Sequence, residues 1–115
     1  MKHWVYDPQS GGIKIPPRVH EGVAIQVESW ARSRTWYPRV QLKLCFRNQF
    51  CYVDSAQEGD MRLFPLCRLR YFDKTRWSFA VFTYSHERYE PCTFPDGTWE
   101  GTIEAALQSC EAFID

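Results

Sequence analysis

The sequence predicts an α+β fold: an antiparallel meander sheet of about five strands, with an N-terminal and a C-terminal helix packed on one face. Three observations support this prediction. Apolar residues recur at helical spacing near both ends of the chain, they alternate with polar residues through the middle, and short turn sequences separate the alternating runs. At 115 residues the chain is long enough for a single domain and too short for two.

The first 16 residues are predicted to form an N-terminal arm, because the Pro and Gly residues of "YDPQSGGIKIPP" disfavour regular structure. Pro17 suits the first position of a helix. The apolar residues that follow form one helical stripe: Val19, Val23, Val27, Trp30 and Ala31. Because Ile25 alternates with two of these valines, a strand over residues 22–30 stays an alternative.

The run "RVQLKLCFR" alternates apolar and polar residues, which is typical of a half-exposed strand. A turn at Asn48-Gln49 would return the chain through "FCYVD" and place Phe46 opposite Cys51. The same register sets Lys43 opposite Asp54 as an opposite-charge pair on the other face. Register and apolar pattern therefore agree for this hairpin.

A second hairpin joins "FPLCRLRYF" to "RWSFAVFTYS" through residues 73–75 and sets Leu69 opposite Phe79 on an apolar face. Part of its other face is apolar too. There the register gives two pairs: Leu66 with Phe82 and Phe64 with Tyr84. A strand that is apolar on both faces needs cover on both, so we expect something other than the helices to cover these four side chains.

The segment "RYEPCTF" is predicted to be an edge strand, because Pro91 cannot donate a ladder hydrogen bond. "FPDG" follows as a turn with Asp96-Gly97 at its tip. Thr102 is a suitable N-cap for the last helix. The apolar stripe of this helix is Ile103, Ala106, Leu107, Cys110, Phe113 and Ile114.

Charge is balanced over the whole chain but unevenly distributed. Residues 33–76 contain nine basic and four acidic residues, whereas residues 77–115 contain seven acids and Arg88 as the single Lys or Arg. We expect the basic residues to gather with aromatic ones on one sheet face: Arg39, Lys43, Arg47, Arg68, Arg70 and Arg76, with Tyr52, Phe82 and Tyr84. This pattern makes nucleic-acid binding an alternative function, although the last helix carries acids.

The sequence contains no pattern of catalytic or metal-binding residues. The five Cys and three His lack the paired spacing of a zinc site, and an extended chain would hold His86 far from Cys92. We therefore expect no metal or cofactor, and the absence of a known nucleophile signature favours a role other than catalysis. Without a long apolar run or signal peptide, we expect a cytoplasmic protein with reduced cysteines.

Residues 77–107 resemble small uncharacterised bacterial domains in which an aromatic strand leads to a Tyr-Glu-Pro segment and then to a helix capped by Gly-Thr. The corresponding positions are Trp77, Tyr89-Glu90-Pro91 and Gly101-Thr102. The resemblance implies a bacterial source and no particular activity.

These observations predict an interaction domain that binds a partner, or a second copy in a homodimer, through the sheet face opposite the helices. The candidate binding residues are Phe64, Leu66, Phe82, Tyr84, Arg68, Arg70, Arg76 and Arg88. Alternatively, Trp4 and Tyr6 of the arm cover the apolar part of this face. A further alternative is a small-molecule ligand in a pocket lined by four tryptophans: Trp30, Trp36, Trp77 and Trp99.

Overall fold

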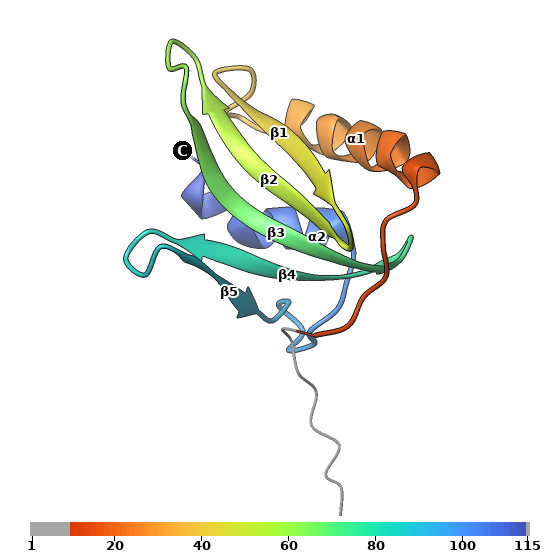
Figure 1. Ribbon diagram of the computed structural model, residues 1–115. Helices are drawn as coiled ribbons and strands as arrows, with labels where there is room; N and C mark the ends of the chain where they lie inside the picture. The colour runs from red at the N-terminus through yellow and green to blue at the C-terminus, as the bar shows by residue number, and fades with distance from the viewer. Residues whose placement is uncertain (1–9, 115) are drawn as a thin grey trace, which may run out of the picture.

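The computed structural model describes residues 10–114 and confirms the predicted α+β meander (Figure 1). Five antiparallel strands pair in chain order, with both helices on one side of the sheet. The elements are α1 (Pro17–Arg32), β1 (Val40–Arg47), β2 (Phe50–Gln57), β3 (Leu63–Asp73), β4 (Arg76–Thr83), β5 (Arg88–Cys92) and α2 (Ile103–Cys110), which continues as a 3-10 turn (Glu111–Phe113). Trp4 and Tyr6 lie outside the described residues.

Both helices begin as predicted, and residues 22–30 are helical rather than extended. Pro17 occupies the first position of α1, where its fixed φ angle fits and its missing N–H would have no helical partner. Thr102 caps α2 by accepting a hydrogen bond from the backbone N–H of Ala105. Neither helix, nor any other within residues 10–114, has the length and apolar character needed to cross a membrane.

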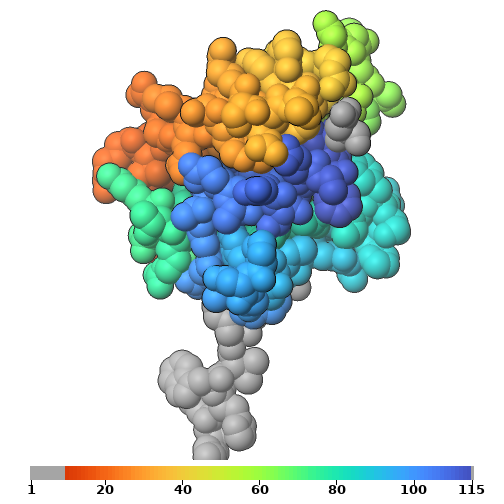
Figure 2. All heavy atoms as spheres, turned by 180° about the vertical axis from the view of Figure 1, so that it is seen from behind, coloured from red at the N-terminus to blue at the C-terminus, as the bar shows by residue number. Residues whose placement is uncertain are grey.

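The core lies between the sheet and the two helices, and Figure 2 shows the helix side, where α1 and α2 hide most of the sheet. Each strand contributes the residues on its helix-facing side, and each helix contributes its apolar stripe. Fully buried members include Ala31, Cys51, Val53, Cys67, Leu69, Trp77, Ala106, Leu107 and Cys110. Burying a side chain the size of leucine contributes about 1.5–3 kcal/mol, so this layer dominates stability.

Phe113 departs from the predicted stripe. The α-helical part of α2 ends at Cys110, and the tighter 3-10 turn that follows changes the direction of the next side chains. Phe113 is consequently 68% exposed, while Ile114 returns to the core. The prediction that Phe113 belongs to the buried stripe is therefore wrong.

Both hairpin registers are confirmed where they were predicted from alternation. Phe46 pairs with Cys51 and Lys43 with Asp54 in the first hairpin, and Leu69 pairs with Phe79 in the second. β5 lies at the edge of the sheet, as the position of its proline indicated.

The register of the second hairpin does not extend to the first residues of β3. The β2–β3 pairing shifts between Val53 and Asp54, and the β3–β4 ladder ends at the pair Cys67–Val81. Pro65 lies at this irregularity, where its missing N–H is tolerated. Leu66 is the extra residue of the bulge and is 3% exposed within the core, so the predicted pairs Leu66–Phe82 and Phe64–Tyr84 do not form.

The described part of the N-terminal arm crosses the sheet at the turn end of β1–β2 and β3–β4 (Figure 1). The backbone N–H of Ile13 donates to the carbonyl of Tyr71 at 3.0 Å, and that of Ile15 donates to Asn48 at 2.9 Å. Gly12 has a φ angle of +89° and lies so close to β3 that an added Cβ would be 2.9 Å from the Tyr71 carbonyl oxygen. The arm thus approaches β3 at a distance that only glycine permits.

Candidate binding surface on the open sheet face

The sheet face opposite the helices, here called the open face, carries a connected set of aromatic side chains. The set, called the ring layer, consists of Phe50, Tyr52, Phe82, Tyr84 and Tyr89. Successive ring centroids lie 5.9 Å apart for Phe50–Tyr52, 5.6 Å for Tyr52–Tyr89, 5.1 Å for Tyr89–Phe82 and 4.9 Å for Phe82–Tyr84. All four contacts are tilted or edge-to-face, the geometries that aromatic quadrupoles favour.

The contact between Tyr52 and Tyr89 joins β2 to β5 across two intervening strands. Neighbouring strands in a sheet are about 4.8 Å apart, so β2 and β5, three strand spacings apart, are separated by about 14 Å. On a flat sheet with large residues in between, the two rings would not meet. Ala80 of β4 lies in the same register row as Tyr52, through Arg68 of β3, and is 4% exposed although no helix covers that face. A small residue on β4 and a curved sheet therefore bring the rings together.

Two arginines of β3 stack on this layer. The Arg68 guanidinium carbon is 4.4 Å from the ring centroid of Phe50 and 5.3 Å from that of Tyr89. Arg70 lies 4.8 Å from the same Phe50 ring and donates a hydrogen bond to the Gly11 carbonyl at 2.8 Å. Arg70 is 5% exposed and fixed by the arm, whereas Arg68 is half-buried and forms no hydrogen bond or ion pair with any described residue.

β1 adds a row of exposed polar side chains to the open face: Lys43, Cys45 and Arg47. They lie opposite Asp54, Tyr52 and Phe50, respectively, in the β1–β2 ladder. Neither Lys43 nor Arg47 forms an ion pair with a described residue. Together with Arg68, these two residues give the open face three cations. No carboxylate of the described chain neutralises any of the three.

Asp54 is the acid that β2 contributes to this face. It is half-buried, and burial raises the pKa of its carboxyl group. Its register partner Lys43 forms no ion pair with it, so the predicted opposite-charge pair exists in register alone. Burial raises the pKa of Tyr89 to about 12, and the charge of Asp54 adds to that shift, as it does for Tyr84.

Of the predicted binding residues, four meet on the open face: Phe82, Tyr84, Arg68 and Arg70. Phe64 lies near them along the chain but is covered by its neighbour Arg62, whose guanidinium is 5.2 Å from the Phe64 ring centroid. Leu66 is in the core, as described above.

Arg88 lies apart from the other predicted binding residues. It pairs with Thr83, one position beyond the pair Phe82–Tyr89, so its side chain leaves the sheet on the helix side. There its Nε donates to Glu90 at 3.2 Å, and Glu90 also contacts Nδ1 of His86 at 2.8 Å.

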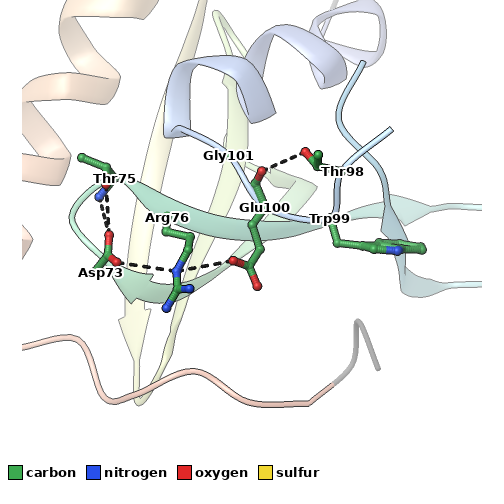
Figure 3. Close-up of a pocket in the computed structure, with 7 residues that line it drawn as sticks. All are labelled: Asp73, Thr75, Arg76, Thr98, Trp99, Glu100 and Gly101. Atoms are coloured by element: carbon green, nitrogen blue, oxygen red, sulfur yellow. Dashed lines mark hydrogen bonds and ion pairs between the residues drawn. The ribbon is translucent and has the colours of Figure 1, made fainter. Parts of the chain in front are cut away.

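Arg76 lies at the far end of the β3–β4 hairpin, beside a shallow surface cavity of about 660 Å³ (Figure 3). Its Nε is 3.5 Å from a carboxylate oxygen of Asp73 and 3.4 Å from one of Glu100. Figure 3 shows the guanidinium held between these two acids, with the Trp99 ring turned away from it. Because two carboxylates neutralise Arg76, it contributes less to anion attraction than Arg68.

The four tryptophans do not line one shared pocket. Trp36 and Trp77 are buried in the core, Trp30 contacts Trp36 with centroids 5.8 Å apart, and Trp99 belongs to the separate cavity beside Arg76. These positions do not support the alternative of one pocket lined by all four tryptophans.

Cys92 and His86 do not form a thiol–imidazole pair. The Cys92 thiol donates to the backbone carbonyl of Glu90 at 3.5 Å, while His86 contacts the carboxylate of the same residue. Burial raises the pKa of the Cys92 thiol, which disfavours the reactive thiolate.

Three members of the ring layer are absent from the predicted binding residues: Phe50, Tyr52 and Tyr89. Tyr52 was expected among the aromatic residues of the basic face, whereas the other two were not. Phe50 could have been found, because the predicted hairpin register already placed it on the same face as Tyr52 and opposite Arg47. Tyr89 required the pairing of β5 with β4, which depends on a turn whose length the sequence pattern left undefined.

No family model, curated protein or solved structure matches the chain.

Proposed function

We propose that the protein is a non-enzymatic binding domain that holds single-stranded nucleic acid on its open face. The observation that carries this proposal is Arg68, stacked on two aromatic rings without an acid partner in the described chain. A guanidinium held in this way keeps its planar set of N–H donors directed at the partner rather than at the protein.

The surroundings of Arg68 suit a flexible polyanion. Lys43 and Arg47 would attract phosphates from the β1 side, and the ring layer offers surfaces on which bases can stack. Stacking on an aromatic side chain contributes about 1–3 kcal/mol per base and tolerates different sequences. A single strand fits better than a duplex, because only unpaired bases expose faces to the rings.

The distribution of acids supports binding on this face rather than on the other. Glu28 and Glu104 lie on the helices, and Glu111 directly follows them. Arg32 pairs with Glu28 and Arg34 pairs with Glu111, so two of these acids are already neutralised and a net negative charge remains at Glu104. On the open face, by contrast, Lys43, Arg47 and Arg68 have no carboxylate partner in the described chain, so charge complementarity favours that face.

Fluorescence anisotropy with a labelled twelve-residue oligothymidylate at low salt tests the proposal. We expect binding by the wild type and about tenfold weaker binding by Arg68→Gln, with a shallower dependence on salt. The matched control is Arg18→Gln, which removes an exposed arginine from α1 and should leave affinity unchanged. Absence of binding at tens of micromolar protein, or equal loss in the two variants, would overturn the proposal.

Self-association is a second candidate, supported by exposed apolar side chains at the irregular end of β3. Leu63 is 51% exposed, and Tyr84 is 58% exposed with its hydroxyl donating to the Pro65 carbonyl at 2.8 Å. These residues could form the centre of a homodimer contact. Light scattering distinguishes a monomer from a dimer. For the wild type we expect twice the chain mass of 13.7 kDa, and for Tyr84→Ser a mass closer to that of the monomer. A wild-type monomer at all concentrations would exclude this candidate.

A further inference from the structure

Asp54 is a hydrogen-bond acceptor that no described residue satisfies. It lies between Lys43 of β1 and Pro65 of β3 in the sheet, and neither residue bonds its carboxylate. The hydroxyl proton of Tyr84 is donated to the carbonyl of Pro65 instead. The carboxylate therefore depends on groups from outside the described chain for its hydrogen bonds.

The environment of Asp54 makes such a bond favourable. Tyr52, which contacts Tyr89, lies two residues before it on the same face, so a ligand that stacks on these rings would also cover the half-buried carboxylate. Covering an acceptor without giving it a donor is costly, so a ligand that brings a donor to Asp54 is favoured over one that does not. Burial of Asp54 is consistent with this, since it raises the pKa of the carboxyl group.

The charges on the open face decide which donor fits. A cationic ligand would be attracted by Asp54 but repelled by Lys43, its register partner on β1, and by Arg68, which lies opposite Tyr52 on the same face. A neutral N–H group avoids that repulsion while still pairing with the carboxylate. In a nucleic acid the neutral N–H groups are on the base edges, and the phosphates remain available for the arginines.

Building on the proposed function, we propose that Asp54 gives the open face a preference for guanine. The Watson–Crick edge of guanine presents two adjacent donors, N1–H and the 2-amino group, which match the two oxygens of one carboxylate. Adenine and cytosine present one amino group there, and thymine offers carbonyl oxygens on both sides of a single N–H. Guanine is thus the base that satisfies both oxygens of Asp54.

The test compares three oligonucleotides of twelve residues: oligothymidylate, the same strand with one central guanine, and the same strand with inosine there. Inosine lacks the 2-amino group and is otherwise identical to guanosine. For the wild type we expect at least about fivefold tighter binding of the guanine strand than of the inosine strand. For Asp54→Asn we expect the two affinities to agree within about twofold, with oligothymidylate bound as tightly as by the wild type or more tightly.

A matched control and the thermal melting curve separate base recognition from folding. Glu21→Gln removes an exposed carboxylate from α1 and should keep the guanine preference. Equal affinity of the wild type for the guanine and inosine strands would overturn the guanine preference and leave the proposed function intact. A preference that survives in folded Asp54→Asn would show that another group reads the base, whereas failure of all three oligonucleotides to bind would overturn the proposed function itself.

Discussion

Leu69 and Arg68 are neighbours on β3, and their side chains leave the sheet in opposite directions. Leu69 enters a layer covered by two helices, whose positions are fixed by many other contacts. Arg68 enters a layer covered only by other side chains of the sheet, with rings and guanidinium groups over Ala80. Both faces exclude water from β4. Under the proposed function, stability and binding would depend on different sides of the same strand.

The largest expected effect is the difference in stability lost when Leu69 or Arg68 is truncated to alanine. Leu69→Ala should lower the free energy of unfolding by about 2–5 kcal/mol, because it leaves a cavity under the helices. Arg68→Ala should lower it by about 1 kcal/mol or less, since the side chain has no ion pair with a described residue. Urea denaturation measures both values. Equal losses would mean that the open face stabilises the fold as strongly as the core does.

Replacing a glycine by alanine should lower stability in the arm and raise it in helix α1. Gly12→Ala should cost at least about 1–2 kcal/mol, because of its φ angle of +89° and the nearby Tyr71 carbonyl, and should loosen the arm from β3. Gly22→Ala should instead stabilise the protein by about 0.5–1 kcal/mol, since nothing lies within 4 Å of the added Cβ on helix α1. Thermal unfolding of the two variants checks the contrast, which fails if Gly12→Ala is neutral.

The smallest expected effect concerns the pH dependence of Asp54. Because burial raises its pKa in the folded state, its protonated form favours folding below about pH 4, and this contribution is lost as the pH rises through the raised pKa. Asp54→Asn should therefore raise the melting temperature by about 1–2 °C at pH 7 and have less effect in acid. Melting curves at both pH values are the measurement. A lower melting temperature at pH 7 would indicate an intramolecular partner for the carboxylate.

The strand pairings could be predicted because alternation fixes which face each residue occupies, and shifting a strand by one residue would expose its whole apolar set. That logic holds for Leu69 and Phe79, which lie in an uninterrupted ladder. It fails at Leu66, because a bulge turns one extra residue towards the core. Pro65 was the available signal, since a proline inside a strand indicates an edge or a bulge.

The open face was predictable in composition but not in arrangement. Alternation placed Tyr52 and Arg68 on one face, whereas the contact of Tyr52 with Tyr89 depends on sheet curvature across strands that are not neighbours. Pairwise strand patterns contain no information about that curvature. The same limit applies to Arg88, whose side of the sheet is set by the length of the turn before β5.

The exposed position of Cys45 provides a practical means of observing this surface. Of the five cysteines, Cys51, Cys67 and Cys110 are buried and Cys92 is half-buried, so Cys45 is the thiol that a water-soluble reagent reaches first in the folded protein. It projects from β1 between Lys43 and Arg47, directly opposite Tyr52. A dye or spin label attached there would be located next to the ring layer of the natural chain, with no residue replaced, and would report directly on occupancy of the open face.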